Sequence, residues 1–127
     1  MFTGIISKTA KVKNVKPAKG GLSLEIFNSF GKVKSGDSIS INGVCSTIKE
    51  LNKNIFFEYM PETLKLSNLS FLKKNDTINT EQSMKLNDKL NGHIVLGHID
   101  GRGEIASIKK EGNSKVFEIT IPAEKFL

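Results

Sequence analysis

The chain has 127 residues, of which 38% are hydrophobic and 25% charged, and its net charge is +6. This length fits one domain of common size, and the composition is typical of a soluble globular protein and too apolar for a disordered one. No apolar run approaches the roughly 20 residues that cross a bilayer, so we expect no membrane partner. The single cysteine, Cys45, excludes a disulfide framework and favours a reducing, cytoplasmic setting.

The positive charge raises the hypothesis of a nucleic-acid partner, because basic domains often bind phosphate backbones. However, Arg102 is the only arginine among the 19 basic residues, and arginine is the side chain that best reads phosphate and guanine. The lysines are also spread along the chain. We interpret most of them as a solvated surface and expect no nucleic-acid partner.

The first part of the chain predicts short strands separated by turns. Residues 4–15 alternate loosely, and their inward candidates are Ile6, Ala10, Val12 and Val15. In the next segment a period of two places on one strand face Leu22, Leu24 and Ile26. A third strand contains Ile39 and Ile41, and the Asn42-Gly43 pair after it is a strong tight-turn signal.

The pattern continues with a strand from Val44 to Leu51, an aromatic-rich strand from Ile55 to Met60 and a strand from Asp76 to Glu81. Between the last two, residues 61–64 predict one helical turn, with Pro61 near its first position. Strands at spacings of about 10 residues with no long helical pattern indicate a closed all-β unit.

A second copy of the first two strands is suggested at an offset of 93 residues. Laying residues 8–34 over residues 101–127 without a gap pairs Val12 with Ile105, Leu24 with Phe117 and Lys32 with Lys125. Four of the 27 pairs are identical, and the apolar positions stay in phase. From this alignment alone, a chance match between two hairpins is an equal alternative.

Several residues are chemically suggestive but have ordinary structural explanations. Cys45 could add to an electrophilic carbon, although a cysteine on a strand is more often a small buried hydrophobe. On a strand it shares a face with Thr47, while Ser46 takes the other face. Glu62 and Thr63, after the Pro61 turn, could hold a polyhydroxylated ligand or simply cap a helix.

Two histidines lie beside glycines, in the pairs Gly92-His93 and Gly97-His98. A glycine neighbour allows close approach of a ligand to the backbone, and histidine transfers protons near neutral pH. The alternative is a structural histidine in a tight turn. No cysteine or carboxylate cluster completes a ligand set around them, so no metal site is expected.

The motifs taken together are more specific than any one of them, and they resemble riboflavin synthase, the α-type lumazine-binding enzyme family, over the whole chain. They are Met1-Phe2-Thr3-Gly4-Ile5, the segment 36–45, Glu62-Thr63-Leu64, Gly92-His93 and the segment 97–101. The resemblance implies two tandem six-stranded Greek-key barrels and a C-terminal helix that drives trimer formation. The expected fold is therefore all-β, a six-stranded closed barrel followed by an incomplete second copy.

In this scheme residues 1–90 form the first lumazine-binding barrel, and residues 91–127 form a linker and the first two strands of a truncated second barrel. The implied reaction is the dismutation of two 6,7-dimethyl-8-ribityllumazine molecules to riboflavin and 5-amino-6-ribitylaminouracil, with no metal or redox cofactor. A four-carbon unit passes from one molecule to the other. The partners would be this substrate, the product riboflavin and further copies of the chain.

The resemblance also implies site residues. The first site would be lined by Gly4, Ile5 and Ile6, with Phe2 beside the ring. The ring and the ribityl chain would meet Cys45, Ser46 and Thr47. A wall would be formed by Glu58, Tyr59, Met60, Pro61, Glu62 and Thr63. A second, pseudo-symmetric site would receive Gly97, His98 and Ile99. The expected catalytic residues are Cys45, as a polar or nucleophilic contact, and His98, as a proton-handling group.

The chain departs from the family at two positions and in its extent. The family usually has leucine where this chain has Ser46, and glycine where it has Asn91. Ser46 should face away from the ligand, so its effect falls on core packing. The family's second hydroxyl-rich motif, its lysine and its late acidic residue have no counterpart, so we expect ligand binding without full activity.

Two alternatives remain beside the enzyme. One is a non-catalytic module that binds a lumazine or a flavin. The other, which the charge permits, is a basic oligonucleotide-binding barrel, and it requires exposed aromatic side chains on a strand face.

Overall fold

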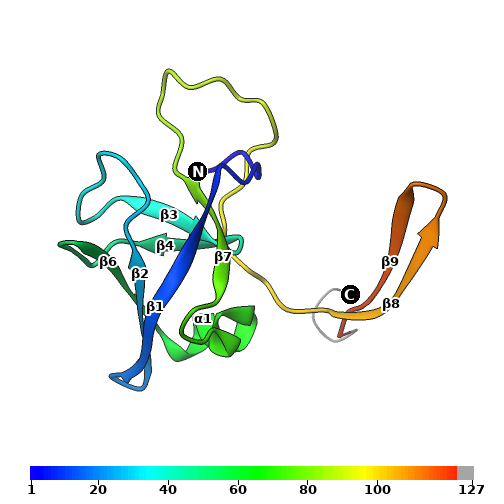
Figure 1. Ribbon diagram of the computed structural model, residues 1–127, viewed down its shortest axis with the longest axis horizontal. Coiled ribbons are helices and arrows are strands. Elements are labelled where there is room, and N and C mark those ends of the chain that lie inside the picture. The colour runs from blue at the N-terminus through cyan, green and yellow to red at the C-terminus, as the bar shows by residue number, and fades with distance from the viewer. Residues whose placement is uncertain (123–127) are drawn as a thin grey trace.

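The computed structural model describes residues 1–122, and its main body is an antiparallel sheet that curls around an apolar core (Figure 1). The strands of this sheet are β1 (Lys8–Ala18), β2 (Gly21–Phe27), β3 (Ser38–Ile41), β4 (Val44–Thr47), β5 (Glu50–Leu51), β6 (Asn54–Tyr59) and β7 (Thr77–Gln82). Their spatial order is β4-β3-β7-β1-β2-β6-β5. Helix α1 (Pro61–Leu66) and a 3₁₀ helix, η1 (Asn68–Phe71), connect β6 to β7.

The chain itself joins the two edges of this sheet. Edge strand β4 ends at Thr47 and edge strand β5 begins at Glu50, so the two edges meet across Ile48 and Lys49. The amide of Ile48 donates to the carbonyl of Asp37 at 2.8 Å, and the amide of Lys49 donates to the carbonyl of Phe56 at 2.9 Å. At this point the backbone stops pairing with β3 and begins to pair with β6, which closes the barrel. The predicted continuous strand from Val44 to Leu51 is therefore wrong, because the corner interrupts it.

The core confirms most of the predicted alternation. Leu24 and Ile26 are fully buried on β2, as are Ile39 and Ile41 on β3. The prediction is wrong at Ile6, which is 44% exposed, because β1 begins at Lys8. The buried hydrophobic cluster consists of Ala10, Val12, Leu24, Ile26, Phe30, Ile39, Ile41, Val44, Ile48, Ile55, Phe57, Tyr59, Leu69 and Ile78.

A separate hairpin of β8 (Glu104–Glu111) and β9 (Ser114–Thr120) follows the barrel and repeats the pairing of β1 with β2. Val15 pairs with Leu24, and 93 residues later Ile108 pairs with Phe117. Each hairpin also has an irregularity at the same place, between Val12 and Asn14 in the first and between Ile105 and Ser107 in the second. The register therefore repeats at the offset found in the sequence. The predicted pair of Lys32 with Lys125 lies outside the described residues.

The second hairpin stands apart from the barrel at the end of an extended segment (Figure 1). Its apolar side chains Ile105, Ile108, Phe117 and Ile119 are more than half exposed. At its base, Arg102 donates to the carbonyl of Ser67 at 3.3 Å and lies 5.1 Å from the centre of the Phe71 ring. None of the helices within residues 1–122 is long and apolar enough to cross a membrane.

Candidate ligand-binding site

A hollow of about 200 Å³ lies where strand β4, helix α1 and the segment after the barrel meet. It is lined by Val44, Cys45, Met60, Glu62, Thr63, Leu66, Gly97, His98 and Ile99. Cys45, Glu62, Thr63 and His98 supply a thiol, a carboxylate, a hydroxyl and an imidazole to one small space. Cys45 and the pair Glu62-Thr63 were predicted at one site and Gly97, His98 and Ile99 at a second, and the structure brings all of them together at one hollow.

The position of Cys45 follows from the tight turn before it. Asn42 and Gly43 both have positive φ angles, of 48° and 89°, as a two-residue hairpin turn requires. The turn sets the phase of β4, so that Val44 and Ser46 are buried and Cys45 is half-buried on the outer face. The predicted strand phase is confirmed, and the thiol faces the hollow.

Gly97 brings the segment after the barrel into contact with Cys45. Its carbonyl accepts a hydrogen bond of 2.9 Å from the amide of Cys45. A Cβ atom at Gly97 would lie 2.8 Å from the Cys45 nitrogen and 2.9 Å from the Cys45 Cβ, and the φ of Gly97 is +76°. Both the space and the backbone conformation therefore require glycine. The neighbouring His98 is placed at the mouth of the hollow as a result.

The same segment crosses the N-terminus of the chain. Phe2 and Val95 exchange two backbone hydrogen bonds, of 2.8 and 3.0 Å, in an antiparallel bridge. These two residues are also 93 positions apart, as are Gly4 and Gly97, which both have positive φ. Equivalent residues of the repeat thus pair with each other, as around a local two-fold axis. Phe2 itself is buried, with 1% of its surface exposed.

Glu81 at the end of β7 anchors this crossing, and nothing in the sequence pattern singled it out. One carboxylate oxygen accepts from the Thr3 amide at 2.6 Å and from the Thr3 hydroxyl at 2.7 Å. The other accepts from the Gly4 amide at 3.1 Å. The side chain is 6% exposed, and a buried carboxylate with three donors is firmly held. The carbonyl of Thr3 in turn accepts from the His93 amide at 2.9 Å.

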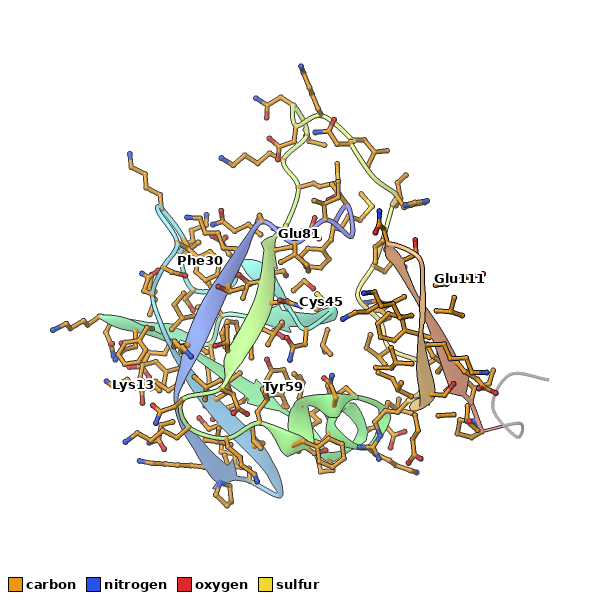
Figure 2. The ribbon with its side chains drawn as sticks, turned by 45° about the vertical axis from the view of Figure 1, so that its right-hand side comes forward. Lys13, Phe30, Cys45, Tyr59, Glu81 and Glu111 are labelled. Atoms are coloured by element: carbon orange, nitrogen blue, oxygen red, sulfur yellow. The ribbon has the colours of Figure 1, made fainter. Side chains whose placement is uncertain are left out.

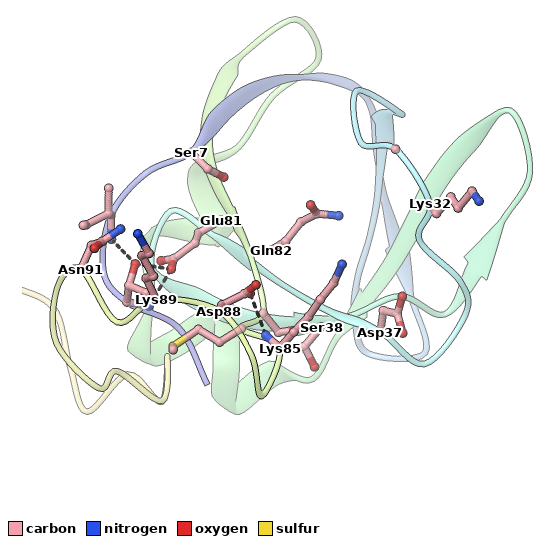
Figure 3. A pocket seen from close by; sticks show the side chains of 15 residues that line it. Ser7, Lys32, Asp37, Ser38, Glu81, Gln82, Lys85, Asp88, Lys89 and Asn91 are labelled. Carbon is pink, nitrogen blue, oxygen red and sulfur yellow. Dashed lines mark hydrogen bonds between the residues drawn. The ribbon is translucent and has the colours of Figure 1, made fainter.

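A larger hollow, of about 730 Å³, lies beside the N-terminal segment (Figure 3). It is bounded by the segments 3–7, 31–38 and 81–91. Its carboxylates are already engaged, because Asp37 accepts from the Lys34 amide, Asp88 from the Lys85 amide and Glu81 from the Thr3 amide. Of the predicted site residues, Ile5 alone lines it, whereas seven line the hollow beside Cys45.

Residues 3–83 match the lumazine binding domain, which is well over half of the chain. The chain belongs to the lumazine-binding domain family. Residues 3–83 therefore form a lumazine-binding domain, and the hollow beside Cys45 lies at the wall of its barrel.

Riboflavin synthases are similar to the chain over nearly its whole length. The protein of Bacillus amyloliquefaciens is 38% identical over 98% of this chain, and that of Actinobacillus pleuropneumoniae is 41% identical over 94%. The riboflavin synthase of Escherichia coli is 36% identical over 91%. The chain spans 59%, 57% and 56% of the length of these three relatives.

Solved structures of LumP have the same fold. LumP complexed with 6,7-dimethyl-8-(1'-D-ribityl) lumazine matches with a TM-score of 0.81 at 20% identity, over 98% of this chain and 71% of LumP. LumP complexed with riboflavin matches with a TM-score of 0.80. The all-β barrel of this family is thus found in the chain.

Other predicted site residues of the lumazine-binding barrel lie away from the hollow. Gly4, Ile5 and Ile6 are exposed on the N-terminal segment and do not line it. Thr47 is exposed farther along β4. Glu58 is also exposed, and it pairs with Lys49, whose hydrogen bond and charge lower the pKa of Glu58. Gly97, His98 and Ile99, expected at a second site, instead lie beside Cys45.

Ser46 and Tyr59 lie beneath the hollow, inside the barrel. They are 2% and 6% exposed, and the phenol of Tyr59 donates to the hydroxyl of Ser46 at 2.8 Å. Burial raises the pKa of Tyr59 well above its ordinary value, and the hydrogen bond to Ser46 offsets this in part. Within residues 1–122, no group of three or more potential metal ligands is assembled.

Proposed function

We propose that this chain binds 6,7-dimethyl-8-ribityllumazine in the hollow beside Cys45, as the first barrel of a riboflavin synthase. The observation that carries the proposal is the contact of Gly97 with Cys45, which joins a thiol, a short helix and an imidazole distant in sequence. The riboflavin synthase relatives and the lumazine bound to LumP support the ligand class.

The chemistry of the hollow suits this ligand. The ring would lie against Cys45 and His98, and the ribityl hydroxyls would reach the Glu62 carboxylate and the Thr63 hydroxyl. The dismutation requires loss of a proton from an acidified ring methyl group and addition of a nucleophile at a ring carbon of the other molecule. His98 would handle the proton, and Cys45 would contact or add to the ring carbon.

The size of the hollow indicates that it holds part of the ligand. Its volume of about 200 Å³ is below the roughly 300 Å³ at which pockets enclose a drug-sized molecule. Face-to-face placement of two rings is the main catalytic requirement of a reaction between two like molecules. A second ring, held by another barrel, would complete the enclosure.

The repeat supports a division of the chain into a first barrel, residues 1–90, and a linker with a second copy of the first hairpin, residues 91–127. At the 93-residue offset, Gly4, Ile5 and Ile6 are equivalent to Gly97, His98 and Ile99. Because the latter line the hollow of the first barrel, the former would line the equivalent hollow of a second barrel. Each copy would thus lend its N-terminal segment to the other.

Titration with 6,7-dimethyl-8-ribityllumazine tests the proposal. We expect its fluorescence anisotropy to rise on binding, and separation of the products reveals whether riboflavin forms. Riboflavin supports an active enzyme, and binding without riboflavin supports a binding module. Absence of binding, together with salt-sensitive binding of single-stranded DNA, would replace the proposal by an oligonucleotide-binding barrel.

Two variants sharpen this test. Thr63→Ala removes one hydroxyl from the hollow, and we expect about a fivefold loss of affinity, as for one hydrogen bond. Thr9→Ala, on the exposed face of β1, is the matched control and should leave affinity unchanged. Equal affinities of the two variants would place the ligand elsewhere.

We also propose that the chain self-associates through the second hairpin. The side chains of Ile105, Ile108, Phe117 and Ile119 form an apolar surface of a kind that soluble monomers seldom expose. Light scattering should give a mass above 14.0 kDa, and Phe117→Lys should lower that mass toward the monomer value. A monodisperse monomer at all concentrations would contradict self-association.

A further inference from the structure

The buried pair of Ser46 and Tyr59 forms a directed chain of hydrogen bonds. The Tyr59 phenol donates to Ser46 Oγ at 2.8 Å, and the Ser46 hydroxyl donates to the carbonyl of Val44 at 3.0 Å. The one proton of Ser46 is therefore used on Val44, and Ser46 is left as the acceptor for Tyr59. A neutral phenol is required for this arrangement, and burial of Tyr59 favours the neutral form.

This hydrogen-bond chain crosses from one wall of the hollow to the other. Ser46 directly follows Cys45 on β4, and Val44 itself lines the hollow. Tyr59 is the last residue of β6 and directly precedes Met60, which lines the hollow, and the helix that carries Glu62 and Thr63. Figure 2 shows Cys45 and Tyr59 on these two parts of the barrel.

The described strand pairing does not connect β4 directly with β6. Among the described strand pairs, β4 pairs with β3, whereas β6 pairs with β2 and β5. The two walls are thus neighbours across the closure of the barrel, where the ladder changes partner. A hydrogen bond in a water-free core is strong and directional, and it holds its partners at one distance.

We propose that Tyr59 and Ser46 are positioning residues that fix the separation between the Cys45 wall and the Glu62–Thr63 wall of the hollow. The hydrogen bond between the two hydroxyl groups sets the separation of the walls at one donor–acceptor distance. The affinity arm of the test rests on the proposed function, whereas the reactivity arm does not.

The lone cysteine offers a readout that needs no ligand. We expect Tyr59→Phe and Ser46→Ala to raise the rate constant for alkylation of Cys45 by iodoacetamide about threefold or more, because the loosened wall opens more often. Both variants should weaken binding of 6,7-dimethyl-8-ribityllumazine about fivefold, as for one lost hydrogen bond. The double variant should resemble either single variant, because the two residues act as one unit.

Ile78→Val is the matched control. Ile78 is fully buried on β7, away from the hollow, so this variant loses stability through packing alone. Urea unfolding identifies conditions under which all variants are fully folded. If Ile78→Val changes Cys45 reactivity as much as the two hydroxyl variants do, the effect is general loosening and the proposal falls.

The outcomes separate the two proposals. Unchanged Cys45 reactivity in both hydroxyl variants overturns the positioning role. Failure of the unaltered chain to bind the lumazine overturns the proposed function, while the alkylation rates still decide the positioning role. If Tyr59→Phe does not fold, Ser46→Ala, which retains the phenol and the packing around it, decides the question by the same two measurements.

Discussion

Gly97 is the single residue on which the arrangement of the hollow depends most directly. Its carbonyl accepts from the Cys45 amide, and its missing side chain leaves room for the Cys45 backbone. His98 reaches the hollow because the chain can turn at this point. At the residue scale, the site is therefore made by a backbone contact as much as by reactive side chains.

Gly97→Ala should separate the segment around Gly97 from strand β4 at Cys45. We expect a loss of about 1–2 kcal/mol in stability from the left-handed conformation. We also expect a 10- to 100-fold loss of lumazine affinity, as for misplacement of a site group by about 1 Å. Titration and urea unfolding measure the two effects.

Gly20→Ala is the matched control for this variant. Gly20 has a φ of +80° and open space around it, so it carries the same backbone strain without a clash. We expect a similar loss of stability and unchanged affinity. An equal loss of affinity in both variants would show that the Gly97 contact has no special role.

Tyr59 provides a second prediction at this scale, since it is the only tyrosine in a chain without tryptophan. Its pKa is raised in the folded state by burial, so its contribution to stability is full below the ordinary pKa of 10.0 and is lost as the pH rises above it. We expect tyrosinate absorbance to appear only together with unfolding. Tyr59→Phe should make stability fall less steeply above pH 10. Ionisation of a fully folded protein at its ordinary pKa would contradict the buried, neutral phenol.

At the scale of elements, the crossing of the N-terminal segment with residues 93–97 holds the site together. Glu81 fixes Thr3 and Gly4, Phe2 pairs with Val95, and two residues later Gly97 meets Cys45. The Glu81 carboxylate on β7 is thus connected to the hollow in two steps. It holds the N-terminal segment, and that segment holds the residues around Gly97 by backbone hydrogen bonds. The short N-terminal segment is a structural element in its own right.

Glu81→Gln should loosen this crossing. The amide keeps the shape but loses the charge that three donors share, and we expect a loss of about 1–3 kcal/mol in stability. Hydrogen exchange should quicken at the amides of Phe2, His93 and Val95. Glu25→Gln, at a partly buried carboxylate on β2 that pairs with Lys13 at 3.0 Å, is the control and should leave these amides protected. Unchanged exchange in Glu81→Gln would show that the crossing does not depend on the carboxylate.

At the scale of the whole molecule, the same hairpin occurs in two environments. The β1–β2 hairpin is closed into a barrel, with β7 paired to β1 and β6 paired to β2. The β8–β9 hairpin has an equal register but pairs only within itself in the described structure. Equivalent apolar residues are thus buried in one copy and exposed in the other.

Leu24 and Phe117 form a matched pair for testing this difference. Leu24→Ala should destabilise the barrel by about 2–5 kcal/mol, because it leaves a cavity in the core. Phe117→Ala should change barrel stability by about 0.5 kcal/mol or less, because its ring is half exposed. Urea unfolding followed by the fluorescence of Tyr59, which lies within the barrel, measures both. A large loss for Phe117→Ala would mean that the hairpin packs against the barrel core.

Local sequence determined the elements of this protein. Period-two alternation in residues 22–26, the Asn42-Gly43 turn and the proline at the start of α1 each act within a few residues, so their outcome can be predicted from the chain alone. The 93-residue repeat could also be detected in the sequence, because the phase of the apolar residues and the strand register follow from the same side-chain alternation. The orientation of Ser46 toward the core followed from the same rule.

Tertiary structure decided the rest. Ile48 breaks a strand that its sequence favours, because the barrel closes there and the backbone must change partner. Glu81 gained its role from donors 77 and 78 residues away in sequence, and such pairings leave no local pattern. The hollow beside Cys45 likewise exists because a glycine far along the chain folds back onto β4. Sequence thus predicted candidate site residues, whereas the closure of the barrel and the crossing of its ends determined which of them meet.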